Sequence, residues 1–442
     1  MLEKIFKLSE LNTNLRREFI GGSTTFMTMA YIIFVQPTVL SAAGMDFGSV
    51  LLATCISSAL AILIMAFYAN YPIALAPGMG QNFFFAYTVV LTLGIAWQKA
   101  LGIVFLAGVV FVILSFFGVR EKIVNAIPQS LKSAIAVGIG LMITLIGLEW
   151  AGLVIDHPTL LVTLGDFGDP PTLLALGGLL LTSILLIKKV PGAMLIGIVA
   201  TTVIGNIAGL IPFRGIFSAP PSMAPTLFKL DILGALSFDL VTIIFTFLIL
   251  DLFDTIGTLI GVASEAGLLK NGKLPRAEKA LLSDALGTVF GAACGTSTVT
   301  SYVESASGVA SGARSGLANV FTALFFILAI FLYPLVQMIG GGIKGADGVI
   351  LYPTIAPILI LVGVYLIKSI RTINWEDFSE SIPAFITFVF IPFSFRITEG
   401  IALGFISYAI LKLFKGKTSD VPFLMWLFAL IFLLRYIFLG VD

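Results

Sequence analysis

Residues 72–87 read PIALAPGMGQNFFFAY, an apolar stretch that two prolines and two glycines interrupt in its first half. Proline breaks a continuous helix but suits its first turn, so Pro77 favours a helix that starts there. We predict that residues 72–92 form a broken membrane span, in which an extended piece runs into a short helix. Residues 297–312 (STVTSYVESASGVASG) predict a second broken span, with Ser and Thr before the helix.

The composition of the chain places both stretches in a membrane protein. Of the 442 residues, 58% are hydrophobic and 11% are charged, whereas an ordinary soluble protein is about 25% charged. This excludes a soluble globular enzyme, a disordered chain and a coiled coil. The 25 Lys and Arg balance 24 Asp and Glu, so the net charge does not point to nucleic acid. Two cysteines and one histidine predict neither a disulfide framework nor a metal site.

Apolar windows of about 20 residues, the length of a bilayer-crossing helix, recur along the whole chain. We predict them at 19–40, 48–69, 99–117, 129–148, 172–188, 192–212, 237–260, 278–295, 318–339, 348–367, 380–395, 397–414 and 421–438. Together with the two broken spans they give about fourteen crossings, and whether 421–438 crosses is left open. The charged N-terminus, residues 1–18, shows no signal-peptide cleavage site.

The basic residues predict the orientation. With a cytoplasmic N-terminus and two crossing broken spans, 19 of the 25 Lys and Arg are cytoplasmic, which is the bias of the positive-inside rule. Four of them are Arg120, Lys122, Lys270 and Lys273. Otherwise the loop 149–171, which holds four acidic residues and neither Lys nor Arg, would be cytoplasmic. We therefore expect a multi-pass protein of the cell membrane with its N-terminus inside.

The chain is predicted to contain an internal repeat. The broken spans are about 224 positions apart, and each follows a helix with several polar residues by one intervening span. We predict two seven-span halves, 19–212 and 237–414, joined by the linker 213–236 and followed by the hydrophobic segment 415–442. Because seven is odd, the halves must be inverted, an arrangement typical of secondary transporters that bind substrate near the midplane between half-helix ends.

Acidic residues within a span are costly and mark function. In DLFDTIGT (251–258), Asp251, Asp254 and Thr258 share one helix face, which must meet a cavity or a polar partner. An alternative remains open for each Asp: it orders nearby backbone or pairs with a basic residue from another helix. The span 237–260 itself holds neither Lys nor Arg.

Polar and aromatic residues also flank the two breaks. Glu304 falls in the first turns of its helix, where free N–H groups suit a carbonyl or anionic group, and its carboxylate can accept ring N–H groups or a proton. Alternatively, Glu304 caps its own helix beside a packing face of small residues. Gln81 and Asn82 are the amides nearest the first break, and they could instead satisfy freed backbone groups. Phe26 and Tyr302 are the aromatic candidates.

The predicted site combines two half-helix N-termini with carboxylates and an amide, and it contains no cationic side chain. Such a site suits a neutral ligand rich in N–H donors, with one acid able to carry a coupling proton. An anion exchanger would be expected to place Lys or Arg there. A Na⁺ site of converging oxygens is a further alternative.

Four segments resemble, in order, those of the AzgA-like purine permeases: GGSTTFMTMAYIIFVQP, APGMGQNFFFAYTVV, DLFDTIGTLIGVA and GTSTVTSYVESASGVASGARSGLANV. This is the hypoxanthine/guanine/adenine branch of the nucleobase–cation symporters, related to the nucleobase–ascorbate transporters. The resemblance runs from residue 10 to 415. It implies an all-α polytopic fold of fourteen spans in two inverted repeats, with short β-strands in the broken spans. The implied core is 19–117 plus 237–339, and the implied gate is 129–212 plus 348–414.

The resemblance also assigns roles to residues. Asp254, Glu304 and Asn82 match acidic and amide residues that bind substrate in the family. Thr258 stands where distant uracil relatives carry a histidine tied to proton coupling, so Asp254 becomes the first choice for the proton carrier, with Glu304 second. Gln81 stands where an apolar residue, usually Leu, is expected.

The resemblance implies proton-coupled uptake of hypoxanthine, guanine or adenine, often by a homodimer. The expected substrate-binding residues are Asp254, Glu304, Asn82, Gly80, Val303, Phe26, Thr258 and Tyr302, with Gly80 and Val303 contributing backbone N–H groups. We expect no enzyme activity and no cofactor other than the coupling ion. Alternatives in the same class are permeases for xanthine, uric acid or uracil. An anion channel or exchanger on the same fold is the alternative from a different class.

Overall fold

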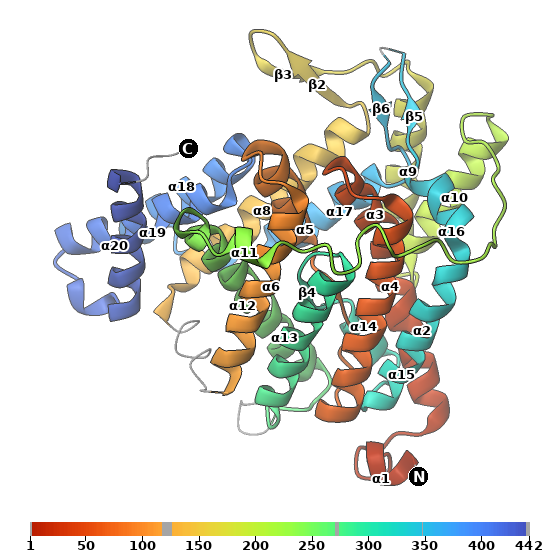
Figure 1. Ribbon diagram of the computed structural model, residues 1–442, viewed down its shortest axis with the longest axis horizontal. Coiled ribbons are helices and arrows are strands. Elements are labelled where there is room, and N and C mark those ends of the chain that lie inside the picture. Colours follow the sequence, from red (N-terminus) through yellow and green to blue (C-terminus); the bar gives the residue numbers. More distant parts are fainter. Residues whose placement is uncertain (1, 117–125, 270–273, 347, 439–442) are drawn as a thin grey trace.

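Among the described residues of the computed structural model (Figure 1), eight helices are long and apolar enough to cross a bilayer, and three shorter apolar helices accompany them. The structure describes residues 2–116, 126–269, 274–346 and 348–438. The predicted cytoplasmic residues Arg120, Lys122, Lys270 and Lys273 lie outside these ranges. The prediction of an all-α polytopic membrane protein is confirmed.

The helices of the first half are α1 (Leu2–Phe6), α2 (Leu15–Met29), α3 (Ile32–Ala42), α4 (Phe47–Ile64), the π-helix η1 (Met65–Ala69), α5 (Met79–Phe83), the π-helix η2 (Phe84–Thr92), α6 (Trp97–Phe116), α8 (Gln129–Trp150), α9 (Pro170–Ile187) and α10 (Ala193–Ile207). Those that follow are α11 (Ile232–Ala235), η3 (Phe238–Leu240), α12 (Val241–Glu265), α13 (Ala277–Cys294), α14 (Ser305–Ala310), α15 (Gly316–Ala329), η4 (Ile330–Leu332), α16 (Tyr333–Gly340), α17 (Ala356–Leu366), η5 (Ile367–Thr372), α18 (Phe378–Ser394), α19 (Ile397–Phe414), η6 (Thr418–Asp420) and α20 (Phe423–Phe438). Their backbone groups bond within each helix, as a bilayer without water requires.

The two broken spans have the predicted form, with a short strand before each half-helix. Strands β1 (Leu75–Pro77) and β4 (Val299–Ser301) precede α5 and α14, are fully buried and pair antiparallel, with Ala76 opposite Thr300. This pairing satisfies backbone groups that no helix could satisfy at the centre of the bundle. Because the strands are antiparallel, α5 and α14 leave the centre in opposite directions.

Three predicted spans differ from the observed helices. The span 19–40 is divided between α2 and α3 at Ala30 and Tyr31, and the span 318–339 is divided between α15 and α16, with Pro334 in the first turn of α16. The span 348–367 begins late, at Ala356, because the residues before it form the hairpin of β5 (Ile343–Lys344) and β6 (Ile350–Leu351). A second hairpin, β2 (Val154–His157) with β3 (Leu161–Leu164), was not predicted either. Both hairpins extend beyond the helices (Figure 1).

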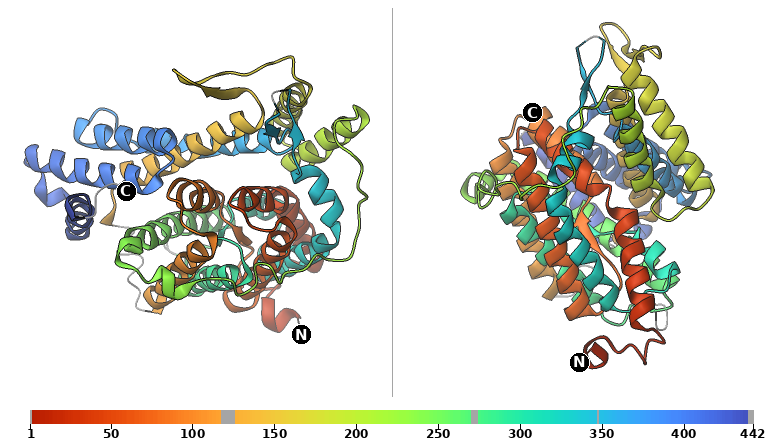
Figure 2. Two further views of the ribbon diagram at one scale, coloured as in Figure 1. Left: turned by 45° about the horizontal axis from the view of Figure 1, so that its top comes forward. Right: turned by 90° about the vertical axis from the view of Figure 1, so that its right-hand side faces the viewer.

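The helices pack in two layers (Figure 2, left). The first layer contains α2 to α6 and α12 to α16, and the second contains α8 to α10 and α17 to α19. The first layer holds the helices of the predicted core segments, and the second holds those of the predicted gate segments. That these layers act as a core and a moving gate, and that the two halves are inverted, stay predictions. The C-terminal helix α20 packs on α19, and its Phe428 and Phe432 also contact Phe245 of α12, so it touches both layers.

Glycines bring α2 close to α14 and α15. A methyl group at Gly22 would overlap the carbonyl oxygen of Ala318, and one at Gly308 would overlap the hydroxyl of Thr25. Small residues at helix contacts let two backbones approach closely in a membrane protein. This approach places the end of α2 beside the start of α14, where Glu304 lies.

Candidate functional site

The candidate site lies where the two half-helices begin, in front of the paired strands. Asp254 on α12 and Glu304 at the start of α14 are close enough for their charges to interact. Gln81 of α5 donates from Nε2 to Asp254 Oδ2 at 3.3 Å. The Tyr31 hydroxyl, at the junction of α2 and α3, donates to Glu304 Oε1 at 2.6 Å. Two other segments of the chain, α5 and the junction of α2 and α3, thus each bond one of the two carboxylates.

Neither carboxylate is neutralised by a cation. Among the residues that the structure describes, neither Asp254 nor Glu304 forms an ion pair. Asp254 is exposed and Glu304 is half-buried, although both lie within the bundle. Carboxylates in this state need water or a polar ligand to offset the cost of leaving bulk solvent.

The face of α12 that carries Asp254 is exposed as far as one end of the helix, and we infer that it lines a crevice open to water. One turn and two turns beyond Asp254 on α12, Gly257 and Gly261 are exposed, and a side chain added at either would meet open space. Val303, two residues before α14, is 58% exposed. The small size of the glycines and the acidity of Asp254 indicate that this face borders water rather than lipid. This exposed face continues to Glu265, the last residue of α12.

The opposite end of the boundary between the layers is closed by aromatic residues. The Trp150 indole at the end of α8 donates to the Tyr87 hydroxyl of η2 at 3.0 Å, and its ring packs on Tyr352 with centroids 4.5 Å apart. The Thr88 hydroxyl donates to the carbonyl oxygen of Phe395 between α18 and α19. The half-helix after β1 is therefore covered by the second layer, whereas the half-helix after β4 faces the crevice.

The predicted amide of Asn82 does not face the crevice. It is fully buried, its Oδ1 accepts from the Ser297 hydroxyl, and its Nδ2 donates to the Pro77 carbonyl oxygen at 3.4 Å. These bonds tie the two broken spans together, which is the structural alternative for an amide at a break. Its neighbour Gln81 is the amide that reaches Asp254.

The other predicted residues fall in several places. Gly80 is half-buried, and a methyl group there would come within 3.0 Å of Ile139 on α8, so it lies at the boundary between the layers. The Tyr302 hydroxyl donates to the Pro77 carbonyl oxygen. Thr258 is 8% exposed, one turn from Asp254.

Phe26 packs against α15. Its ring contacts Phe325 and Phe326 with centroids 5.3 Å apart. The ring of Tyr302 lies 6.4 Å from that of Tyr31, the tyrosine that bonds Glu304.

Sequence reasoning missed four residues around the site. Tyr31 bonds Glu304, Trp150 closes the far end, and Tyr365 of α17 lies near enough to Glu304 to sense its charge from the second layer. Asp284 of α13 is fully buried and accepts from the Ser301 hydroxyl of β4 at 3.3 Å. The sequence offered a signal for two of them. Asp284 is an acidic residue within the predicted span 278–295, and Tyr31 is a tyrosine within the predicted span 19–40, which contains several polar residues.

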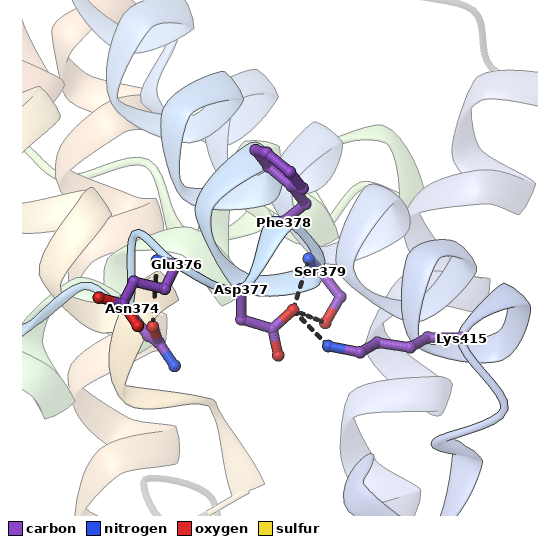
Figure 3. Close-up of a pocket in the computed structure, with 6 residues that line it drawn as sticks. All are labelled: Asn374, Glu376, Asp377, Phe378, Ser379 and Lys415. Atoms are coloured by element: carbon purple, nitrogen blue, oxygen red, sulfur yellow. Dashed lines mark hydrogen bonds and ion pairs between the residues drawn. The ribbon is translucent and has the colours of Figure 1, made fainter.

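A surface pocket lined by residues of 374–379 and by Lys415 does not include either carboxylate of the candidate site (Figure 3). It lies where α18 begins, beside Asp377 and Lys415. The Lys415 ammonium donates to Asp377 Oδ1 at 2.6 Å and holds the pKa of that carboxyl well below its usual range, with help from Ser379. Within the described ranges, no group of three His, Cys, Asp or Glu side chains could hold a metal ion.

A helical bundle with a water-accessible carboxylate pair between two half-helices defines a multi-pass membrane transporter. The chain belongs to the Permease family (Xan_ur_permease), whose family model matches residues 16–403. This membership confirms the resemblance to the nucleobase–ascorbate transporter group.

Named relatives cover nearly the whole chain. The chain is 52% identical over 441 residues to a Methanocaldococcus jannaschii protein named only as a permease, MJ0326, with 99% of both chains covered. It is 43% identical to the adenine permease AdeP of Escherichia coli (99% of this chain, 96% of the relative). It is 44% identical to the guanine/hypoxanthine permease PbuG of Bacillus subtilis (99% and 100%).

A solved structure supports the fold. The transmembrane domain of the cyanobacterial bicarbonate transporter BicA superposes with a TM-score of 0.64 at 16% identity, covering 88% of this chain and 97% of that one. At this identity the likeness concerns the architecture and not the transported molecule.

Proposed function

We propose that the protein takes up purine nucleobases (hypoxanthine, guanine or adenine) in symport with protons, by alternating access. The observation that carries the proposal is the pair Asp254 and Glu304, which lies beside the exposed face of α12 and has no cation partner among the residues that the structure describes. Relatives over 40% identical along the whole chain are named as adenine and guanine/hypoxanthine permeases.

The chemistry of a purine suits this pair. Ring and exocyclic N–H groups are donors that two carboxylates can accept, and such charge-assisted bonds are the stronger ones. Carbonyl and ring nitrogen acceptors of the base would meet the backbone N–H groups of Gly80 and Val303, at the starts of the two half-helices. The exposed side chain of Val303 and the ring of Tyr302 would border the base.

Proton coupling follows from the cost of a buried charge. Closing the crevice over an ionised Asp254 or Glu304 removes water from a carboxylate, which is costly. A proton and a bound base together relieve that cost, so the loaded carrier reorients more easily than the empty one. The crevice and the aromatic closure at Trp150 then correspond to an inward-facing state, if the N-terminus is cytoplasmic.

Substitution of each acid tests the proposal. Loss of a charge-assisted bond of about 1.5–3 kcal/mol predicts a fall of about 10- to 100-fold in uptake efficiency for Asp254→Asn and Glu304→Gln. Radiolabelled hypoxanthine uptake is measured in proteoliposomes with and without an inward proton gradient. The matched controls are Asp156→Asn, at an exposed position of the β2–β3 hairpin, and Glu376→Gln, at an exposed loop position. Unchanged, proton-driven uptake by both acid variants would refute the proposal.

The remaining expectations belong to the same proposal: a cell-membrane location with a cytoplasmic N-terminus, a homodimer, and transport without catalysis. Competition by xanthine, uric acid and uracil in the same assay separates the purine permease from its rivals in the class. Anion exchangers are the rival from a different class. Two carboxylates that form no ion pair among the described residues would repel an anion at the site.

A further inference from the structure

We propose that Tyr31 is a positioning residue for Glu304. By bonding one carboxylate oxygen of Glu304, Tyr31 leaves the other oxygen to contact the purine and to carry the proton. This inference rests on the proposed function, and it concerns a residue far from the acid in the sequence. The Tyr31 side chain is 2% exposed, and its hydroxyl donates to Glu304 Oε1 at 2.6 Å across 273 sequence positions.

The junction that carries Tyr31 orients the Glu304 carboxylate. Tyr31 follows the last residues of α2, where the span divides before α3. The Thr28 hydroxyl, in the last turn of α2, donates to the Thr25 carbonyl oxygen at 2.9 Å and lies 3.3 Å from the backbone oxygen of Glu304. The side-chain bond that reaches Glu304 from this break in the first span is therefore the one from Tyr31.

A hydrogen bond from a phenol makes the two oxygens of a carboxylate unequal. When Oε1 accepts the Tyr31 hydrogen, a proton placed on Oε1 would force the phenol to turn and leave its own O–H unsatisfied in a buried site, which is unfavourable. A proton taken up from crevice water therefore resides on Oε2. Ionised, Oε2 accepts a purine N–H; protonated, it donates to a ring nitrogen or carbonyl.

The other titratable groups that face Glu304 do not replace this bond. Asp254 of α12 and Tyr302 lie in the first layer, and Tyr365 of α17 faces it from the second. Within the described part of the chain, the side-chain hydrogen bond to the Glu304 carboxylate comes from Tyr31. Tyr365 is 44% exposed, and its ring lies under the Lys368 ammonium at 4.8 Å. Tyr365 is therefore the matched control: a tyrosine that faces the same acid without bonding it.

The test is the pH profile of hypoxanthine uptake by Tyr31→Phe in proteoliposomes between pH 5 and 9. The ionised carboxylate loses a donor, so protonation becomes easier and the alkaline midpoint of uptake moves up by about one pH unit. Tyr365→Phe keeps the wild-type midpoint. In a Glu304→Gln background, Tyr31→Phe produces no further change, whereas a merely structural role would add a further loss.

The outcomes separate this inference from the function on which it rests. A wild-type protein that takes up none of the three purines overturns both. Wild-type uptake with a Tyr31→Phe profile that superimposes on it overturns the inference alone. Should Tyr31→Phe fail to fold, Glu304→Asp withdraws the carboxylate from the same hydroxyl by one methylene. Its midpoint must then move in the same direction, and an unmoved midpoint refutes the role of Tyr31.

Discussion

The attachment of the C-terminal helix can be measured through one buried ion pair. Arg435 near the end of α20 donates to Glu399 Oε1 at 2.7 Å, and the Tyr436 hydroxyl donates to Oε2. The side chains of Arg435 and Glu399 are 12% and 9% exposed. Arg435→Met keeps most of the aliphatic packing and leaves the buried carboxylate without a cation. Such a loss typically costs about 3–5 kcal/mol in free energy of unfolding.

Arg435→Met is therefore expected to lose about 3–5 kcal/mol in free energy of unfolding at pH 7. The assay is denaturation of the purified protein in detergent at pH 7.

Arg214→Met, at an exposed loop position, is the matched control and should change stability by less than about 0.5 kcal/mol. The double variant Glu399→Gln with Arg435→Met removes the unpaired charge while keeping an acceptor for Tyr436, and it should recover most of the loss. A loss for Arg435→Met no larger than that of the control would refute the reasoning.

Three further predictions concern other contacts. Trp150→Phe removes the hydrogen bond to Tyr87, of about 0.5–1.5 kcal/mol, which closes the end of the molecule opposite the crevice. The conformational equilibrium should therefore move about 2- to 13-fold toward the state in which the crevice is closed. Slower maleimide labelling of a Gly257→Cys variant measures this change, with Trp375→Phe as the control. Gln81→Leu removes the donor to the α12 carboxylate and should change the apparent KM for purine by about 2- to 10-fold without loss of folded protein. Lys415→Met should cost about 0.2–1 kcal/mol in free energy of unfolding. Because the pKa of Asp377 is lowered in the folded protein, that cost is present above about pH 4 and disappears as the pH falls further; equal denaturation of variant and parent at pH 7 would contradict it.

The broken spans and the acidic residues could be predicted because their signals lie within a few consecutive residues. Contacts between residues far apart in the sequence, such as that of Tyr31 with Glu304, could not be predicted. Pro77 and the Ser/Thr run act on their own backbone, so the broken spans could be placed from the sequence. Asp254 could be found because an acid within an apolar helix is unusual wherever that helix packs. The choice between Gln81 and Asn82 could not be made, because consecutive helix residues point about 100° apart and packing decides which one meets the crevice.

The likeness to a bicarbonate transporter shows why the fold alone does not determine the substrate. The N-terminus of a long helix contributes about half a positive charge, and a short half-helix contributes less, so two of them cannot offset two ionised carboxylates. With Asp254 and Glu304 both ionised, an anion in the crevice meets net repulsion, while a neutral base meets acceptors for its N–H groups. One proton on either acid leaves the site near neutrality, so protonation changes which part of a base the site can bind. Substrate chemistry on this scaffold therefore depends on a few side chains in front of the paired strands.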